Sequence, residues 1–323
     1  MTHATEPLKM DTIAESGREN RLSVLKKFGS WMAAALILGY LFFRIDFETF
    51  YQSIRMAELH VYLPLIIGFV FVWFLIESQN IMVVCKHLGH TLSYHQSLDI
   101  RGVTYLLMII NPFVGLGGIA FYLKKELGIP LVRASSVMIF YSYTEMMCLL
   151  VFVAAGSTII PDPPLLFRQM YYMSIGFIIF YTSLITISRR LPARGMFKKV
   201  TDSQIWGTFF EAKTRSFIIL PLWRSIYFIS FVFFFHFGLK AFQIDIPLIR
   251  LFVYVPLIFW IGCWPITPFG LGTIQASMLY FFREYSSEAN ILAFSISYST
   301  LLLIFRVPIG LYYLRKYNSL KKR

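Results

Sequence analysis

Charged residues are scarce in this sequence. Asp, Glu, Lys and Arg make up 15% of its 323 residues, whereas soluble domains carry about a quarter. Hydrophobic residues make up 57%, and the mean hydropathy is +0.63. This excess cannot be buried in one core, because a folded domain of this length still needs a polar surface. The composition excludes an ordinary soluble domain and predicts an integral membrane protein.

The sequence patterns of common enzymes are also missing. No glycine-rich phosphate loop ending in Lys-Ser or Lys-Thr occurs, so ATP hydrolysis is not supported. Neither a Ser-His-Asp order nor a paired-acid motif stands out. We therefore expect no enzymatic activity and no cofactor.

Candidate metal ligands are few and poorly spaced. The three cysteines lie far apart, in or beside apolar stretches: Cys85, Cys148 and Cys263. We interpret them as small buried hydrophobic residues rather than as a disulfide framework or a metal site. Three histidines lie close together between two membrane segments: His87, His90 and His95. A zinc or copper site normally adds a Cys or carboxylate ligand, so we favour interfacial histidines and expect no metal.

Long apolar runs dominate what is present. A membrane-spanning helix needs about 20 mostly apolar residues. Six runs are candidates, of which the first is short: 28–43, 61–84, 130–155, 169–187, 217–239 and 289–314. No cleavable signal peptide precedes the first run, so we expect it to remain as a span.

Two further apolar regions, 98–123 and 247–282, are interrupted by Pro and Gly at 111–118 and 264–272. Pro removes a backbone donor and Gly weakens a helix. Irregular backbone is viable in hydrocarbon only where it is buried in protein or lines an aqueous cavity. We interpret each region as a re-entrant hairpin of two half-helices; the alternative is a single kinked span. The predicted fold is all-α, with six full transmembrane helices and two re-entrant hairpins.

Lys and Arg are distributed unevenly between the predicted loops. With two hairpins, 22 of the 30 fall on one side of the membrane and 6 on the other, while Arg224 and Arg306 fall inside spans. Because positive loops favour the cytoplasm, both termini are expected there, with the protein in the cytoplasmic (inner) membrane. We attribute the net charge of +13 to basic loops facing anionic lipid, not to nucleic-acid binding.

The predicted organisation is a single membrane domain with short polar ends. A cytoplasmic N-terminal segment, the membrane domain and a basic cytoplasmic tail occupy 1–27, 28–314 and 315–323. The halves of the domain are about 28–187 and 217–314, and the basic cytoplasmic loop 188–216 joins them.

The two interrupted regions resemble each other. Pro112 and Pro268 each precede a Phe and a Gly-Leu-Gly triplet, and the triplets 115–117 and 270–272 lie 155 residues apart. In the predicted topology the first hairpin opens to the cytoplasm and the second to the outside. Two similar broken elements that enter from opposite faces predict an inverted-repeat transporter.

These motifs resemble the transmembrane region of the lysylphosphatidylglycerol synthases, a flippase-like family that includes free-standing members without the synthase domain. The best match is Pro-Ile-Thr-Pro-Phe-Gly-Leu-Gly-Thr-Ile-Gln at 265–275. The family usually has Pro-Ile-x-Pro-Gly-Gly-Leu-Gly, then a charged pair ending in Glu. Here Phe269 replaces the first of these glycines, and Gln275 takes the acidic place.

The first half of the chain also resembles this family. Residues 112–118 and 124–130 are similar to its Pro-x-x-x-Gly-Gly-Glu segment and the turn that follows, with Ile119 at the acidic place. In the next span the family tends to carry Glu-Arg-x-x-Asp, and here Glu145 stands in for the acid. The resemblance, over roughly 28–314, implies re-entrant helices and a role in moving lipids across the bilayer. The chain ends nine residues after the last predicted span, so we expect no lysyl transfer.

A few ionisable residues fall inside predicted spans: Glu77, Glu145, Arg224, Arg306 and, as a weaker candidate, His236. Mid-membrane charges are costly and usually face a cavity or a partner. Guanidinium groups bind phosphate bidentately, so we predict that Arg224 and Arg306 contact an anionic headgroup. Glu77 and Glu145 would be counter-charges or proton carriers. The alternatives are structural ion pairs and, for Arg306, snorkelling to the interface.

The two hairpin motifs offer a second way to hold phosphate, because N–H groups at a helix N-terminus can point at an anion. The alternative is close helix packing through small residues. The candidates are Asn111, Pro112, Gly115, Gly117, Gly118, Pro265, Thr267, Pro268, Gly270, Gly272 and Gln275. Asp99 and Arg101 flank the beginning of the first hairpin, and the simplest interpretation pairs them with each other.

The predicted function is a membrane lipid transporter, or flippase, for a lipid with a polar, phosphate-bearing headgroup. The sequence does not name the lipid, because phospholipid, aminoacyl-phospholipid, polyprenyl-phosphate sugar and hopanoid all fit a groove with two arginines. One alternative is a membrane-embedded transferase. The other is a partner that positions a separate glycosyltransferase or lipid synthase. The expected partners are a lipid substrate, the bilayer, and either a second copy of the chain or a lipid-modifying enzyme.

Overall fold

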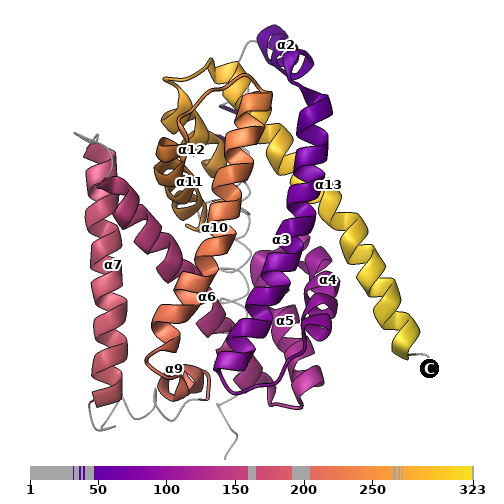
Figure 1. The fold of residues 1–323 in the computed structure, drawn as a ribbon, viewed down its shortest axis with the longest axis vertical. Helices are drawn as coiled ribbons and strands as arrows, with labels where there is room; N and C mark the ends of the chain where they lie inside the picture. The colour runs from indigo at the N-terminus through magenta and orange to yellow at the C-terminus, as the bar shows by residue number, and fades with distance from the viewer. Residues whose placement is uncertain are drawn as a thin grey trace, which may run out of the picture.

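The computed structural model describes residues 47–158, 165–190, 204–264 and 272–321, together with Met32, Leu36, Ile37, Gly39, Tyr40, Thr267 and Gly270. These residues form helices and no strand, which confirms the all-α class (Figure 1). The helices are α2 (Phe47–Met56), α3 (Leu59–His87), α4 (Tyr94–Ile110), α5 (Pro112–Leu127), α6 (Leu131–Ser157), α7 (Leu165–Arg190), α9 (Gly207–Glu211), α10 (Ser216–Ala241), α11 (Leu248–Gly262), α12 (Thr273–Phe282) and α13 (Glu288–Lys321).

Five of these helices are long and apolar enough to cross a membrane: α3, α6, α7, α10 and α13. They coincide with five of the six predicted spans, which supports a multi-pass membrane protein. The predicted first span, 28–43, lies outside the described residues except for five single positions, and segment 1–27 lies outside them entirely.

Helices α4 and α5 occupy the first interrupted region and lie antiparallel. The chain turns at Asn111, whose backbone is extended. Gly115 of α5 lies against Met108 of α4, and Gly118 lies against Thr104, one turn earlier in α4. The two helices therefore fold back on each other instead of forming one kinked helix.

The glycine at position 115 is required by this close approach. A Cβ atom there would lie 2.1 Å from Cγ and 3.1 Å from Cα of Met108, whereas a Cβ at Gly117 meets nothing within 4 Å. We expect Gly115→Ala to destabilise the protein by about 1–3 kcal/mol, as overpacking usually does. Thermal unfolding of the purified protein in detergent measures this, with Gly117→Ala as the matched control. Equal melting temperatures for the two variants would contradict the observed packing.

Helices α11 and α12 occupy the second interrupted region and also fold back on each other. The rings of Tyr254 in α11 and Phe281 in α12 stack with centroids 5.6 Å apart. At the other end of the pair, Gly262 lies close to the side chain of Ile274. Most of the connecting segment, including Pro265 and Pro268, lies outside the described residues.

The two helix pairs open at opposite ends of the bundle (Figure 1). The N–H of Glu58, just before α3, donates to the carbonyl of Ala241 at the end of α10 at 2.8 Å, so α3 and α10 run antiparallel. The α4–α5 pair follows the end of α3, and the α11–α12 pair follows the end of α10. Each pair therefore begins and ends at its own side of the molecule.

Aromatic packing holds α3 against α10. The rings of Phe69 and Phe234 stack with centroids 4.2 Å apart, and Trp73 meets Phe231 edge to face at 5.0 Å. Such pairs add to the energy of the buried apolar area. This contact fixes the relative height of the two helices and so places their polar residues opposite one another.

Candidate functional site

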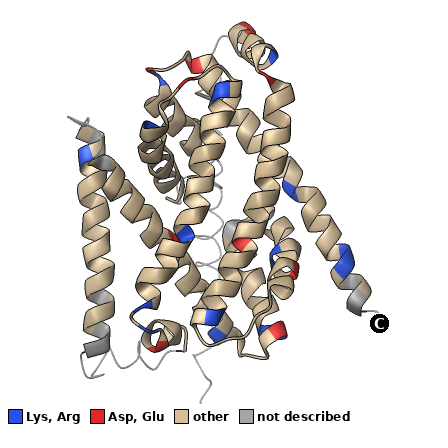
Figure 2. Cartoon of the chain, in the orientation of Figure 1, with Lys and Arg blue, Asp and Glu red and all other residues tan. Residues whose placement is uncertain are grey.

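Charged residues lie mostly near the helix ends, but a few lie in the middle of the bundle (Figure 2). The central group comes from five helices and consists of Glu77 (α3), Arg101 (α4), Glu145 (α6), Arg224 (α10) and Arg306 (α13). We call it the central charge cluster.

Glu77 lies between two arginines at the centre of this cluster. It is 4% exposed, and Arg101 and Arg224 are 3% and 2% exposed. Arg101 Nη2 donates to Glu77 Oε2 in an ion pair. Arg224 Nη2 lies 3.9 Å from Glu77 Oε1 and 3.0 Å from Glu145 Oε1. The arginine of α10 therefore links the carboxylates of α3 and α6.

Aromatic rings cover the guanidinium groups. Arg224 lies 4.1 Å from the ring centroid of Tyr227, and its Nη1 donates to the hydroxyl of Tyr141 at 2.7 Å. Arg306 lies 4.1 Å from the ring centroid of Trp73. Cation–π contacts of this kind stabilise desolvated charges. They also place Arg306 against α3, inside the bundle, rather than in a snorkelling position.

The cluster carries an excess of positive charge and of hydrogen-bond donors. Its three arginines face two glutamates, and no carboxylate among the described residues lies within 4.0 Å of Arg306. The Nε atoms of all three arginines and Nε1 of Trp73 are buried and have no hydrogen-bond partner among the described residues. Unpaired buried donors are costly. An anion that reached the cluster would neutralise its excess positive charge.

Glu145 connects the cluster to the surface. Its side chain is 36% exposed, whereas the side chains of Glu77 and Arg224 are about 5% and 3% exposed. An apolar cavity of about 170 Å³ lies between α6, α7 and α11, lined by Met146, Leu150, Phe177, Tyr181, Trp260, Cys263 and Trp264. Met146 in this lining is the residue next to Glu145 in α6. A polar group at Glu145 and an apolar chain in the cavity would therefore be neighbours.

The predicted motif in the first helix pair is occupied by its own contacts. The side chain of Asn111 accepts hydrogen bonds from the N–H groups of Phe113 and Val114, and its carbonyl accepts from the N–H of Gly115. These first-turn donors at the start of α5 are thus paired. Together with the contacts of Gly115 and Gly118 with α4, this favours helix packing over anion binding at this end.

The second motif is also internally bonded where it is described. Gly270 and Gly272 have φ values of 67° and 86°, which side chains rarely adopt. The N–H of Gly272 donates to Gln275 Oε1 at 2.7 Å, and Gln275 Nε2 donates to Ser299 in α13 at 3.0 Å. The hydroxyl of Thr267 lies 3.2 Å from that of Thr273. These residues shape the turn before α12 and tie it to α13.

Arg101 was not predicted as a site residue, and its expected pairing with Asp99 is wrong. Asp99 pairs with Lys316 of α13 at 2.5 Å, while Arg101 pairs with Glu77. The first interrupted region was predicted to begin at residue 98, because only its apolar residues were used to define it. A capping box between Ser93 and Gln96 starts α4 at residue 94, so Arg101 lies two turns inside the helix. The Ser-x-x-Gln spacing was the available signal.

Comparison with known proteins identifies the family. Among curated proteins, none matches the chain significantly. Residues 28–310 match the family described as the lysylphosphatidylglycerol synthase TM region. The match covers most of the chain and includes every residue of the central charge cluster. The chain therefore belongs to the lysylphosphatidylglycerol synthase TM region family, as its motifs predict.

Proposed function

We propose that this protein is a flippase, and not an enzyme, that moves a lipid with a phosphate-bearing headgroup across the cytoplasmic membrane. The observation that carries this proposal is the excess positive charge of the central charge cluster. A phosphodiester carries one negative charge, and guanidinium groups bind it with two parallel hydrogen bonds. A bound headgroup would neutralise the cluster, and its departure would leave donors that attract the next one.

The lipid approaches, in this proposal, from the side of α6, α7 and α11. Glu145 is the exposed member of the cluster, and the apolar cavity beside it suits an acyl chain. The chains remain in hydrocarbon while the headgroup crosses, so the cost of moving charge into the membrane falls on the headgroup alone. The cationic side chains reduce that cost.

The proposed topology places both termini in the cytoplasm, with α4–α5 and α11–α12 as re-entrant hairpins of an inverted repeat. The opening of the two helix pairs at opposite ends of the bundle supports it. So does the recurrence of Gly-Leu-Gly at 115–117 and 270–272. Alternating access in such repeats exposes a central site to each side in turn.

Reconstitution in liposomes tests the proposed function. Wild type, Arg224→Ala and Glu145→Ala would be compared by dithionite quenching of fluorescent lipids with several headgroups. We expect wild type to move phosphate-bearing lipids and both variants to lose this activity. Arg224 is one of the cations proposed to hold the headgroup, and Glu145 is the carboxylate that pairs with it.

A folded wild type that moves none of the lipids would contradict the proposal. So would variants that match wild type, because the cluster would then be structural. Either result would favour the alternative of a partner or transferase that acts with a separate lipid enzyme.

A further inference from the structure

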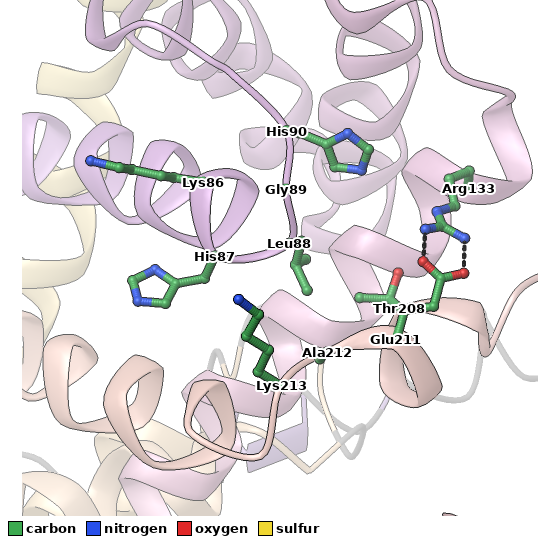
Figure 3. Close-up of a pocket in the computed structure, with 10 residues that line it drawn as sticks. All are labelled: Lys86, His87, Leu88, Gly89, His90, Arg133, Thr208, Glu211, Ala212 and Lys213. Carbon is green, nitrogen blue, oxygen red and sulfur yellow. Dashed lines mark hydrogen bonds and ion pairs between the residues drawn. The ribbon is translucent and has the colours of Figure 1, made fainter.

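A second cavity, which is lined by charged and polar residues, lies at the end of the bundle where α4–α5 opens (Figure 3). It has a volume of about 250 Å³. Three segments line it: the end of α3 with the turn after it (86–90), Arg133 near the start of α6, and α9 with the two residues that follow it. These segments belong to three loops that the charge distribution places on one side of the membrane. The cavity is separate from the central charge cluster.

The charges lining this cavity are mainly positive. Of the described residues, three cations line it, Lys86, Arg133 and Lys213, together with one carboxylate, that of Glu211. Arg133 holds this carboxylate through both terminal nitrogens, with Nη1 at 2.5 Å from Oε1. Among the described residues, Lys86 and Lys213 have no carboxylate within 4.0 Å. In Figure 3 the ammonium group of Lys213 is directed toward the end of α3. Glu211 is thus neutralised, and the lysine charge is unmatched.

Two uncharged polar groups of the cavity also lack partners. Thr208 is 2% exposed, and in the described part of the chain its Oγ1 has no hydrogen-bond partner. Nε2 of His90 is buried and likewise unpaired. Burial, and then the charge of Arg133, lower the pKa of His90. Its ring can donate from Nε2 in the tautomer that carries the proton there. A buried hydroxyl without a partner is unusual in a folded protein, and here it lines a cavity.

We propose that this cavity binds a phosphate group, through the ammonium of Lys213, the hydroxyl of Thr208 and the ring of His90. The ligand must be an anion, because among the described lining residues the unmatched charge is positive and the one carboxylate, that of Glu211, is already paired. Several donors arranged around one volume suit the multiple acceptor oxygens of phosphate. The proposed site is independent of transport through the central charge cluster. A lipid headgroup at the membrane surface and a soluble phosphate compound share this chemistry.

Calorimetric titration of the purified full chain in detergent with inorganic phosphate tests the site. We expect wild type to bind, and Lys213→Gln and Thr208→Val each to bind roughly tenfold or more weakly, because each loses a hydrogen bond to a charged group. Lys213 is exposed, so its replacement leaves the core intact. Lys125→Gln is the matched control, because Lys125 is an exposed lysine of α5 that donates to Tyr317 and does not line the cavity.

Native mass spectrometry with added phosphatidylglycerol then distinguishes the two sources. Adducts that depend on Lys213 and Thr208 would assign the site to a lipid headgroup. Binding of inorganic phosphate with the same dependence, but without such adducts, would assign it to a soluble phosphate compound. Absence of both kinds of binding in wild type would overturn the proposal. So would losses of the same size in Lys125→Gln, which would indicate general surface attraction.

Discussion

Glu77→Gln is expected to destabilise the protein by about 3–5 kcal/mol, the cost of removing one partner from a buried ion pair. Glu77 is the carboxylate that faces both Arg101 and Arg224, and all three side chains are at most 5% exposed. Its loss leaves Arg101 as an unpaired buried cation and Arg224 with Glu145 alone. Thermal unfolding in detergent, followed by tryptophan fluorescence, measures the change.

A double variant and a surface control make this result specific. Glu77→Gln combined with Arg101→Gln removes both charges of the pair and should recover at least half of the lost stability, because no unpaired cation remains. Glu126→Gln removes an exposed carboxylate that accepts from Gln96 and should change stability by less than about 0.5 kcal/mol. No recovery in the double variant would mean that Glu77 stabilises the protein through its packing and not through its charge.

Arg306→Gln is expected to slow lipid transport by roughly tenfold to a hundredfold, the usual effect of losing a hydrogen bond to a charged group. Stability should fall by only about 1–2 kcal/mol, the value of its cation–π contacts with Trp73 and Tyr105. Arg306 has no carboxylate partner among the described residues, so its removal leaves no buried anion unpaired. The liposome assay and thermal unfolding, on the same preparation, measure both quantities.

Arg283→Gln provides the matched control. Arg283 also lies over an aromatic ring, that of Tyr280 at 5.3 Å, but it is exposed and outside the central charge cluster. We expect it to transport like wild type. If Arg306→Gln unfolds the protein, or transports at the wild-type rate, Arg306 is a structural residue and not a headgroup contact.

Hydropathy was enough to predict the five long helices, because a long apolar run is a local feature of the sequence. The runs of α3, α6, α7, α10 and α13 are apolar over the thickness of a bilayer. In the first of the two interrupted regions the break falls at Asn111, just before Pro112, whereas the glycines at 115, 117 and 118 lie inside α5. Sequence alone could not decide between a kinked helix and an antiparallel pair, because that depends on contacts such as that of Gly115 with Met108.

The site was predicted only in part, because its ion pairs join residues far apart in the chain. Arg224 meets Glu145 and Glu77 through the packing of α10 against α6 and α3, which no local pattern encodes. Arg101 was missed because a polar first turn conceals the beginning of α4. The roles proposed for Arg224, Arg306, Glu77 and Glu145 in transport remain predictions.

The ratio of transport rates for two fluorescent lipids tests the central claim most directly. Phosphatidylglycerol carries a phosphate and a negative charge, whereas glucosylceramide has a polar headgroup without phosphate. In liposomes containing the wild-type protein, we predict transport of phosphatidylglycerol well above the rate in protein-free liposomes and no such increase for glucosylceramide. Equal rates for the two lipids, or no increase for phosphatidylglycerol, would contradict a central charge cluster that selects a phosphate-bearing headgroup.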